Sequence, residues 1–304
     1  MNRKKKKRGR TVQRERRIYH GEYLDVHVFP MFQKPGKRGK KRNPSTEVQR
    51  LLNQKYREER VTYLIHSNFD VRDIEIKLGF DDEHLPESYS DFQRIMRNFI
   101  RAVKRMRTKY GLKEMKYIYV IERGKRNGRW HAHMITNGAD GEETVLIGYD
   151  DKGKPIHRSY RSMFEDLWEK YGGPKARTFS LDFNDEGLSG LSKYKVKEPE
   201  TEIAEIDEKV RRWAASKNLN PPKIPQDRDG FISREMTREI REGKYTERDI
   251  ERLYPGYTVS TIQPLLNEVN KGEYLTIRLR KTRASRVTKE VFTGIKNKKS
   301  RRRR

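Results

Sequence analysis

Cysteine is absent from the 304 residues of this chain. Disulfides and thiolate zinc sites are therefore excluded, and any metal ion must be held by nitrogen and oxygen ligands. Hydrophobic residues are scarce at 33%, and no apolar run is long enough for a signal peptide or a membrane span. A Gly-rich phosphate loop ending in Lys-Ser or Lys-Thr is also missing, so we expect no attached helicase domain. These absences predict a soluble, cytoplasmic protein with a modest core and loose ends.

Acidic residues are few relative to basic ones. Lys and Arg together number 71 against 44 Asp and Glu, and the net charge is +27. Such a surplus repels itself and indicates a polyanionic partner, for which nucleic acid is the first choice. An anionic membrane surface is the alternative, but no basic amphipathic helix stands alone to favour it, so we expect no membrane partner. Basic runs over residues 1–17, 34–42 and 296–304 predict solvated tails that make non-specific phosphate contacts.

The middle of the chain has the periodicity of folded elements. Apolar residues alternate over residues 74–80, as in a half-buried strand, and recur at helical spacing over residues 92–106. The outer face of that helix carries Arg94, Arg97, Arg101, Lys104 and Arg105. Residues 116–123 and 129–136 are typical of two strands, and the segment between them is rich in turn formers.

Further elements follow toward the C-terminus. Turn signals and periodicity predict a small hairpin at residues 145–156, a helix at 160–171 and a strand at 178–183. Beyond them we expect a short helix at 188–196, helices near 232–240 and 250–254, and a late strand at 275–279 that could pair with the central sheet. Helices that return to one sheet predict an α+β fold, a central antiparallel sheet with helices packed on it.

These elements give an expected domain organisation. A basic, partly disordered N-terminal region spans residues 1–59, and the main domain spans residues 60–225. Helices and a strand that pack on the core follow over residues 226–285, and residues 286–304 form a basic tail.

Two histidines alternate with apolar residues in the strand expected at 129–136. His131 and His133 flank Ala132, so both imidazoles lie on one face of the strand. Two neighbouring imidazoles can hold one divalent ion. The simpler alternative is a pair of half-exposed strand residues, and only a third ligand in the right place favours the metal site.

Glu122 is the candidate third ligand, because it lies one hairpin turn before His131. Its carboxylate shares the histidine face only if Glu122 is paired with His131, since a slip of one residue would turn it to the other face. Otherwise Glu122 is a solvent-facing residue paired with Arg123 or Arg129. A site with two nitrogens, one oxygen and open positions suits Mg²⁺ or Mn²⁺ bound together with a phosphate.

Tyr194 and Lys197 form the second candidate pair. On a helix, residues three positions apart share a face, so both side chains could point into one site. A tyrosine hydroxyl can attack a DNA phosphate and keep the bond energy in a phosphotyrosine, and the lysine could orient the phosphate or stabilise the phenolate. Any one of the 16 tyrosines is more often an ordinary core or surface residue.

Three ordered segments together resemble the HUH endonucleases, in particular the rolling-circle replication initiators of phages and plasmids of the filamentous-phage gene II type. Residues 73–80 are similar to that family's first motif, a strand ending in an aromatic residue. Residues 129–135 look like its His-hydrophobic-His motif, and residues 190–197 look like its tyrosine motif. The segment 211–221 also resembles one that follows the tyrosine motif.

The resemblance implies an HUH endonuclease fold with an RRM-like core and a specific chemistry. The implied reaction is nicking of one DNA strand at an origin through a 5′-phosphotyrosine on Tyr194, with a divalent ion on His131 and His133 and with Glu122 as third ligand. We expect a DNA substrate that is single-stranded or an origin hairpin, and host helicase and polymerase as partners. The residues expected to contact DNA are Arg129, Lys193, Lys195, Arg211 and Arg212.

The chain departs from the family pattern in a few positions. Ala132 is smaller than the usual residue between the histidines, and Lys77 and Gly79 stand where threonines are frequent. Gly190 occupies the place of a second tyrosine four positions before Tyr194, so we expect a single nucleophile.

Two other interpretations remain open. A transposase or a mobilisation relaxase would use the same site and chemistry. A non-catalytic protein that binds single-stranded nucleic acid would explain the charge and the aromatic residues, with the histidines and Tyr194 as ordinary fold residues.

Overall fold

The computed structural model describes residues 12–31, 46–124, 128–181, 213–268 and 270–282. Its contacts divide the chain into one unit of residues 47–220 and a second unit that combines residues 1–46 with residues 221–304. Each unit has an antiparallel sheet covered by helices, which confirms the α+β class. In this division both ends of the chain share one unit.

The unit of residues 47–220 is built on a five-stranded sheet with the strand order β8-β3-β5-β4-β9, and every neighbouring pair is antiparallel. The strands are β3 (Ile74–Leu78), β4 (Tyr117–Arg123), β5 (Trp130–Thr136), β8 (Ala176–Ser180) and β9 (Trp213–Ala215). The predicted strands at 74–80, 116–123 and 129–136 are therefore confirmed. The strand that carries both histidines, β5, lies at the centre.

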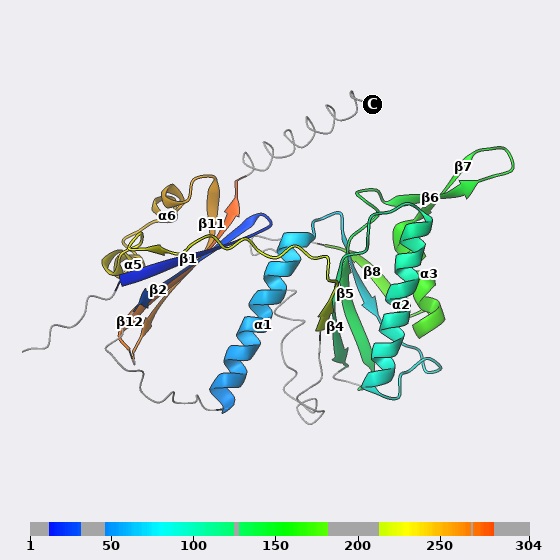
Figure 1. The fold of residues 1–304 in the computed structure, drawn as a ribbon, viewed down its shortest axis with the longest axis horizontal. Helices are drawn as coiled ribbons and strands as arrows, with labels where there is room; N and C mark the ends of the chain where they lie inside the picture. Colours follow the sequence, from blue (N-terminus) through cyan, green and yellow to red (C-terminus); the bar gives the residue numbers. More distant parts are fainter. Residues whose placement is uncertain (1–11, 32–45, 125–127, 182–212, 269, 283–304) are drawn as a thin grey trace, which may run out of the picture. The chain divides into compact units, whose positions relative to one another are not determined.

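Helices cover both faces of this sheet (Figure 1). On one face, α2 (Tyr89–Lys109) and α3 (Tyr160–Gly172) bury an aromatic-rich core against Ala132 and Met134 of β5. On the other face, α1 (Thr46–Asn68) packs its C-terminal half against Ile135. Successive strand residues point to opposite faces, so His131 and His133 lie on the α1 side of the sheet.

Both ends of α2 have identifiable capping groups. Ser88 Oγ accepts a hydrogen bond from the Asp91 N–H at 3.2 Å and so satisfies one orphan donor of the first turn. At the other end Gly111 has φ +67°, and the Gly111 and Leu112 N–H groups donate to the Thr108 and Arg107 carbonyls. This pair of hydrogen bonds around a left-handed glycine is the Schellman motif, which ends the helix at Gly111.

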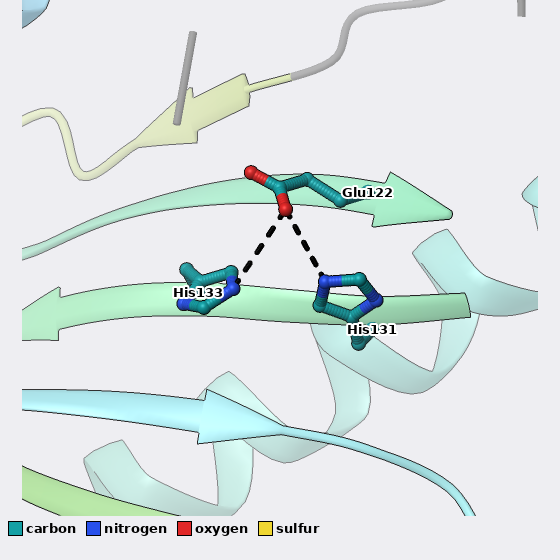
Figure 2. A group of neighbouring side chains, drawn as sticks. All are labelled: Glu122, His131 and His133. Atoms are coloured by element: carbon teal, nitrogen blue, oxygen red, sulfur yellow. Dashed lines mark hydrogen bonds and ion pairs between the residues drawn. The ribbon is translucent and has the colours of Figure 1, made fainter. Parts of the chain in front are cut away.

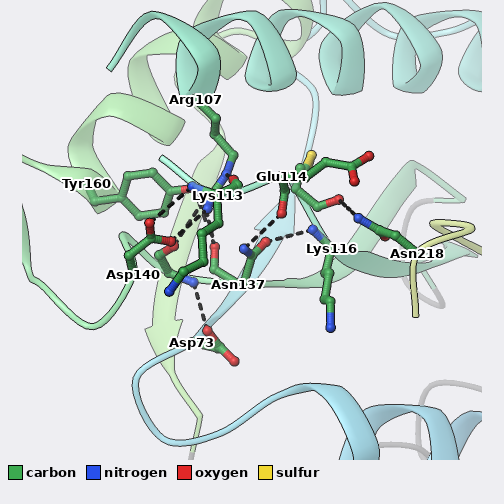
Figure 3. Close-up of polar contacts among 11 residues, drawn as sticks. Asp73, Arg107, Lys113, Glu114, Lys116, Asn137, Asp140, Tyr160 and Asn218 are labelled. Atoms are coloured by element: carbon green, nitrogen blue, oxygen red, sulfur yellow. Dashed lines mark hydrogen bonds and ion pairs between the residues drawn. The ribbon is translucent and has the colours of Figure 1, made fainter. Parts of the chain in front are cut away.

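Arg107 fastens the C-terminal end of α2 to the sheet (Figure 3). Its side chain is 1% exposed, and its guanidinium donates to the Lys113, Asn137 and Gly138 carbonyls at 2.7–3.1 Å and also to Tyr160 Oη. A buried charge is tolerated only when its donors are satisfied in this way. Arg107 therefore serves the fold of this unit.

The smaller elements also follow the predicted pattern. The strands β6 (Thr144–Tyr149) and β7 (Pro155–Ser159) form a two-stranded hairpin. The helix α3 ends at Gly172, one residue beyond the predicted range. The strand expected at 178–183 is found slightly earlier, as β8. The short helix expected at 188–196 lies outside the described residues. No helix within the described ranges is long and apolar enough to cross a membrane.

The second unit has its own five-stranded antiparallel sheet, with the order β10-β1-β2-β12-β11. Its strands are β1 (Val12–His20), β2 (Tyr23–Met31), β10 (Arg228–Asp229), β11 (Tyr257–Asn267) and β12 (Gly272–Lys281). Two short helices, α5 (Arg234–Arg241) and α6 (Glu247–Leu253), bury Ile240 and Ile250 against it.

Two expectations need correction here. The late strand at 275–279 is part of β12, which pairs with β2 and β11 and not with the sheet that carries the histidines. Residues 12–17 are not a solvated tail, because they belong to β1, where Glu15 is 1% exposed. The Glu15 carboxylate is bound by Arg228 and by Tyr254 Oη, both more than 200 positions away, so the sequence around it looks like a basic run.

Candidate metal centre

The register of the β4–β5 hairpin places Glu122 and the two histidines on one face. Glu122 is paired with His131, and Val120 with His133. Residues directly opposite each other in an antiparallel pair point to the same side. The register that the metal hypothesis required is therefore confirmed. The turn itself lies only partly within the described chain, where Gly124 N–H donates to the Arg129 carbonyl at 2.8 Å.

The three side chains converge on a single carboxylate oxygen (Figure 2). Glu122 Oε2 lies 3.2 Å from His131 Nε2 and 3.7 Å from His133 Nε2. One ligand atom from each residue lies within 4.8 Å of the other two, and this trio is the metal-competent cluster found among the described residues. The two imidazole planes are inclined by 74°, so they are not stacked on each other.

These distances fit a divalent ion. Nitrogen and oxygen ligands lie about 2.0–2.2 Å from Mg²⁺ or a first-row transition ion, so ligand atoms at tetrahedral or right angles are about 3.0–3.5 Å apart. The separations of 3.2 and 3.7 Å from Glu122 Oε2 agree with that spacing to within a small side-chain adjustment. The donor set of two imidazoles and one carboxylate suits Mn²⁺ and other transition ions, and accommodates Mg²⁺.

Each imidazole has an acceptor behind it. His133 Nδ1 lies 3.3 Å from Glu75 Oε1, and His131 Nδ1 lies 3.5 Å from the Arg129 carbonyl oxygen. In metal sites the nitrogen opposite the ligating one donates to a carboxylate or carbonyl, which fixes the tautomer and the ring orientation. Glu75 was not predicted as a site residue. The only feature of the sequence that could have indicated a role for Glu75 was its position in the first motif, two residues before Lys77. The pairing of β3 with β5 brings Glu75 close to His133.

The contact of His133 Nδ1 with Glu75 leaves Nε2 directed toward Glu122 and able to bind a cation. A neutral imidazole that donates from Nδ1 to Glu75 presents an acceptor lone pair on Nε2. That lone pair faces Glu122 Oε2 at 3.7 Å, so two acceptors confront each other. Either a second proton makes the ring an imidazolium or a metal ion lies between the two acceptors. Both arrangements satisfy Nε2 and Oε2, and a metal ion would in addition engage His131 Nε2, which lies 3.2 Å from the same oxygen.

The cluster is accessible and has cations beside it. The side chains of Glu122, His131 and His133 are 24%, 17% and 12% exposed, so a substrate oxygen could reach an ion held there. Lys77 of β3 lies opposite His133 of the neighbouring strand β5. On the other side of β3, Arg177 of β8 lies opposite Lys77. Both side chains are exposed on the histidine face. Neither Lys77 nor Arg177 was predicted as a site residue. Both could contact the phosphates of a DNA strand that lies across this face of the sheet.

Arg129 is held by other groups. Its guanidinium donates to Asp82 Oδ1 and, at 3.1 Å, to the Phe80 carbonyl, so it ties β5 to the segment after β3. The Arg129 side chain is 32% exposed, and its contact with DNA stays a prediction. Glu122 is paired with neither Arg123 nor Arg129 in the described contacts, and Arg123 lies over the Trp130 ring.

Two departures from the family pattern have packing reasons. Ala132 is fully buried against α2 and α3 in a core already filled by large aromatic residues such as Phe92 and Trp168. Gly79 comes close to the segment after α3. A side chain there would place its Cβ 3.2 Å from the Lys175 carbonyl oxygen, and the Gly79 carbonyl accepts from Trp168 Nε1 at 2.8 Å.

The predicted nucleophile lies in a segment that the structure does not describe. Tyr194, Lys197, Lys193, Lys195, Arg211 and Arg212 all fall within residues 182–212, so their roles stay predictions. The flanking residues are placed, however. Leu181 and Trp213 both pack with Ile118 and Ile135 on the face that carries the histidines. The two residues that flank the undescribed segment thus lie on the side of the sheet where the metal cluster lies.

Three buried or half-buried tyrosines of the sheet and of α3 are poorly suited to attack a phosphate. Tyr117 and Tyr119 alternate with Ile118 and so point toward the α2 face, away from the cluster. Burial raises the pKa of Tyr119 and of Tyr160 to about 12. A phenol with a raised pKa is harder to deprotonate, so these residues do not replace Tyr194 as candidate.

Comparison with known proteins adds one finding. Residues 76–198 match the family model of the replication-associated proteins of the ORF2 and gene II protein type. No curated protein and no solved structure matches the chain. The matched region includes the last three residues of β3, the β4–β5 hairpin with Glu122 and both histidines, and Tyr194, and so it contains most of the three motifs that carried the resemblance in the sequence. The region from residue 76 to residue 198 is therefore similar to this family of replication-associated proteins.

Proposed function

We propose that this protein initiates rolling-circle replication by nicking one DNA strand at an origin, with Tyr194 as nucleophile and a divalent ion on Glu122, His131 and His133. The observation that carries the proposal is the convergence of these three ligands on one sheet face inside a replication-associated family region. The basic composition of the chain also supports DNA as the substrate, since a net charge of +27 favours a polyanionic partner.

The reaction joins the DNA to the protein. Tyr194 Oη attacks the scissile phosphorus and loses its proton, a Tyr194–phosphate ester forms, and the bond from phosphorus to the 3′ oxygen breaks. The leaving 3′ oxygen takes up a proton, and the 5′ end remains on the tyrosine. The phosphoester is retained, so a later 3′ hydroxyl can reverse the step and rejoin the strand.

The residues around the phosphate have distinct tasks. Glu122, His131 and His133 hold the cation, which when bound withdraws electron density from the phosphate oxygens as a Lewis acid. Lys77 and Arg177 are placed to hold the flanking backbone on the same face of the sheet. Lys197 orients the phosphate or stabilises the Tyr194 phenolate.

The described residues on either side of the segment that contains Tyr194 lie close enough to the metal cluster for Tyr194 to reach it. Ser180 is connected through Ile74 and Thr136 to β5, two strands away, and strand spacings put it about 14 Å from His133. Trp213 is opposite Val120, which is opposite His133, so it lies about 10 Å away. Tyr194 follows Ser180 by 14 positions, a length that could span about 45 Å when extended.

The experiment is a covalent trapping assay. The full chain is incubated with single-stranded DNA carrying the origin of its own replicon and with Mn²⁺, and adducts are resolved by denaturing electrophoresis. We expect an adduct for the wild-type protein and for the control Tyr149→Phe, because Tyr149 is a 66% exposed residue of β6. Tyr194→Phe should form no adduct while its DNA affinity is unchanged.

The alternatives give different results. An adduct from Tyr194→Phe would show that another residue attacks. Absence of cleavage with every origin strand and with both Mg²⁺ and Mn²⁺ would favour a non-catalytic binding protein. A transposase or relaxase would form the same adduct but would cleave at an element end or a transfer origin instead of a replication origin.

A further inference from the structure

We infer that the solvent-facing side of α2 is a second DNA-binding surface, which holds duplex DNA by its phosphates on the side of the sheet opposite the metal centre. The use of this surface during nicking depends on the proposed function, whereas its affinity for duplex DNA does not.

The surface is made almost entirely of cations. From residue 94 to residue 109, every exposed position of α2 except Thr108 carries a positive charge. We call these residues the α2 basic stripe, and they are Arg94, Arg97, Arg101, Lys104, Arg105 and Lys109. At 100° per residue they fall within an arc of about 140° and extend over about 22 Å along the helix axis.

Few acidic groups compensate these charges. Arg94 is paired with Asp91 at 2.9 Å, and Asp91 is the only acidic residue of the helix. Arg101 donates to the neutral Asn98 amide oxygen. Among the described residues, Arg97, Lys104 and Arg105 form no salt bridge. The buried Arg107 on the same helix, in contrast, donates hydrogen bonds to carbonyl oxygens and is paired with Asp140.

Folding of the helix does not explain the pattern. Arg97 and Arg101, Arg101 and Arg105, and Arg105 and Lys109 are each four residues apart, and a like-charge pair at this spacing destabilises a helix. Salt bridges to acidic residues at those positions would stabilise the helix instead. The three like-charge pairs therefore weaken the free helix, and an anionic partner that covers them would stabilise it.

The stripe cannot be part of the metal centre. The apolar side of α2 packs on Ala132 and Met134, which alternate along β5 with His131 and His133. A helix diameter of about 10 Å and the thickness of the sheet thus separate the stripe from the cluster. A single strand bound along the histidine face does not reach the stripe, so the stripe is available to another stretch of the same DNA.

The chemistry of the stripe favours a duplex. Aromatic platforms on which unpaired bases stack are absent from its exposed positions, so the described surface offers charge without base stacking. A membrane surface is not favoured either, since an interfacial helix exposes large apolar residues and α2 buries them. Evenly spaced point charges on a rigid helix match the fixed phosphates of a double helix.

The test compares three variants of the full chain. The stripe variant carries Arg97→Gln, Arg101→Gln and Arg105→Gln. A charge-matched control carries Arg238→Gln, Arg248→Gln and Arg252→Gln on α5 and α6, and a rescue variant carries lysine at the three stripe positions. Affinity for a short duplex of arbitrary sequence, and for a single strand of equal length, is measured against salt concentration without divalent metal. Far-UV circular dichroism verifies the helix content.

We expect the stripe variant to bind the duplex at least about tenfold more weakly than the control, with the slope of log K against log salt shallower by about 2.7, which is about 0.9 for each of three lost phosphates. Lysine should restore both values. Single-strand affinity should fall less, and adduct formation at saturating single-stranded DNA should persist.

Equal duplex affinity and slope in the stripe variant and the control would overturn the inference. An equal loss for duplex and single strand would overturn its preference for duplexes. If the wild-type protein never cleaves DNA but the stripe variant still loses duplex affinity, the proposed function fails and the second surface stands.

Discussion

At the residue scale, the decisive feature is that Glu122 Oε2 meets both histidines while Glu75 lies behind His133. The position of Glu122 could be predicted, because it depends on one local hairpin and on the two-residue period of strands. The position of Glu75 could not. It is 58 positions from His133, and only the pairing of β3 with β5 brings the two side chains together.

Glu75 should orient His133 for metal binding. We expect Glu75→Gln to weaken Mn²⁺ affinity about 10- to 100-fold, because loss of the carboxylate behind a ligating imidazole reduces its basicity and frees its ring. Isothermal titration calorimetry measures the affinity, and Glu83→Gln, an exposed carboxylate outside the cluster, is the control. Equal Mn²⁺ affinity in the two variants would show that Glu75 does not support the site.

A second residue-scale prediction concerns the stability of the other unit. Asp25 is buried, and although burial alone raises the pKa of its carboxyl, bonds from Arg278 at 2.8 Å and from His20 lower that pKa well below the ordinary value. A group with a lowered folded-state pKa contributes stability above its unfolded-state value of about 3.9 and loses it as the pH falls below that value.

We therefore expect the free energy of unfolding to decrease as the pH is lowered from about 5 to about 3, and Asp25→Asn to make that decrease smaller. Hydrogen exchange of β2 amides, measured against pH, follows this unit specifically. The exposed Asp151→Asn is the control and should leave the pH dependence as in the wild-type protein. An unchanged slope in Asp25→Asn would mean that other carboxyl groups cause the acid sensitivity.

At the scale of elements, periodic apolar residues predicted α2, α3 and the β4–β5 hairpin well, because each buries one continuous apolar face. The same signal missed β1. Its buried positions include Gln13, whose Nε2 donates to the Glu273 carbonyl, and Glu15, which accepts from Arg228 far along the chain. Buried polar residues with distant partners give no local pattern, so β1 looked like part of a basic tail.

The strand β5 has no room for the larger residue that the family places between the histidines. We expect Ala132→Leu to lower the free energy of unfolding by about 1–3 kcal/mol, because extra methyl groups in a filled core force its neighbours apart. Urea unfolding measures the change. The half-buried Ala215→Leu on the edge strand β9 is the comparison and should cost less. A neutral Ala132→Leu would mean that the core around β5 has unfilled space.

At the scale of the whole molecule, the region that matches the replication-associated family model lies, in chain order, between the two halves of a second sheet unit. No local pattern could predict this, since joining residues 12–31 to residues 257–281 depends on pairing across more than 200 positions. The excess positive charge, in contrast, was evident from composition and points to DNA without any knowledge of the fold.

The terminal basic segments should add affinity without adding chemistry. We expect removal of residues 1–11 and 283–304, which leaves β1 and β12 intact, to weaken DNA binding and to flatten its salt dependence. Adduct formation at saturating DNA should persist. Binding is measured by fluorescence anisotropy over a salt series. Loss of the adduct at saturation would show that these segments help to build the site.

The central claim is that Glu122, His131 and His133 hold a divalent cation, and anomalous X-ray diffraction from crystals grown with Mn²⁺ tests it most directly. The account predicts an anomalous peak about 2.0–2.4 Å from Glu122 Oε2 and from one ring nitrogen of each histidine, and loss of that peak in His133→Ala. Crystals saturated with Mn²⁺ that show no peak between these three side chains would contradict the account.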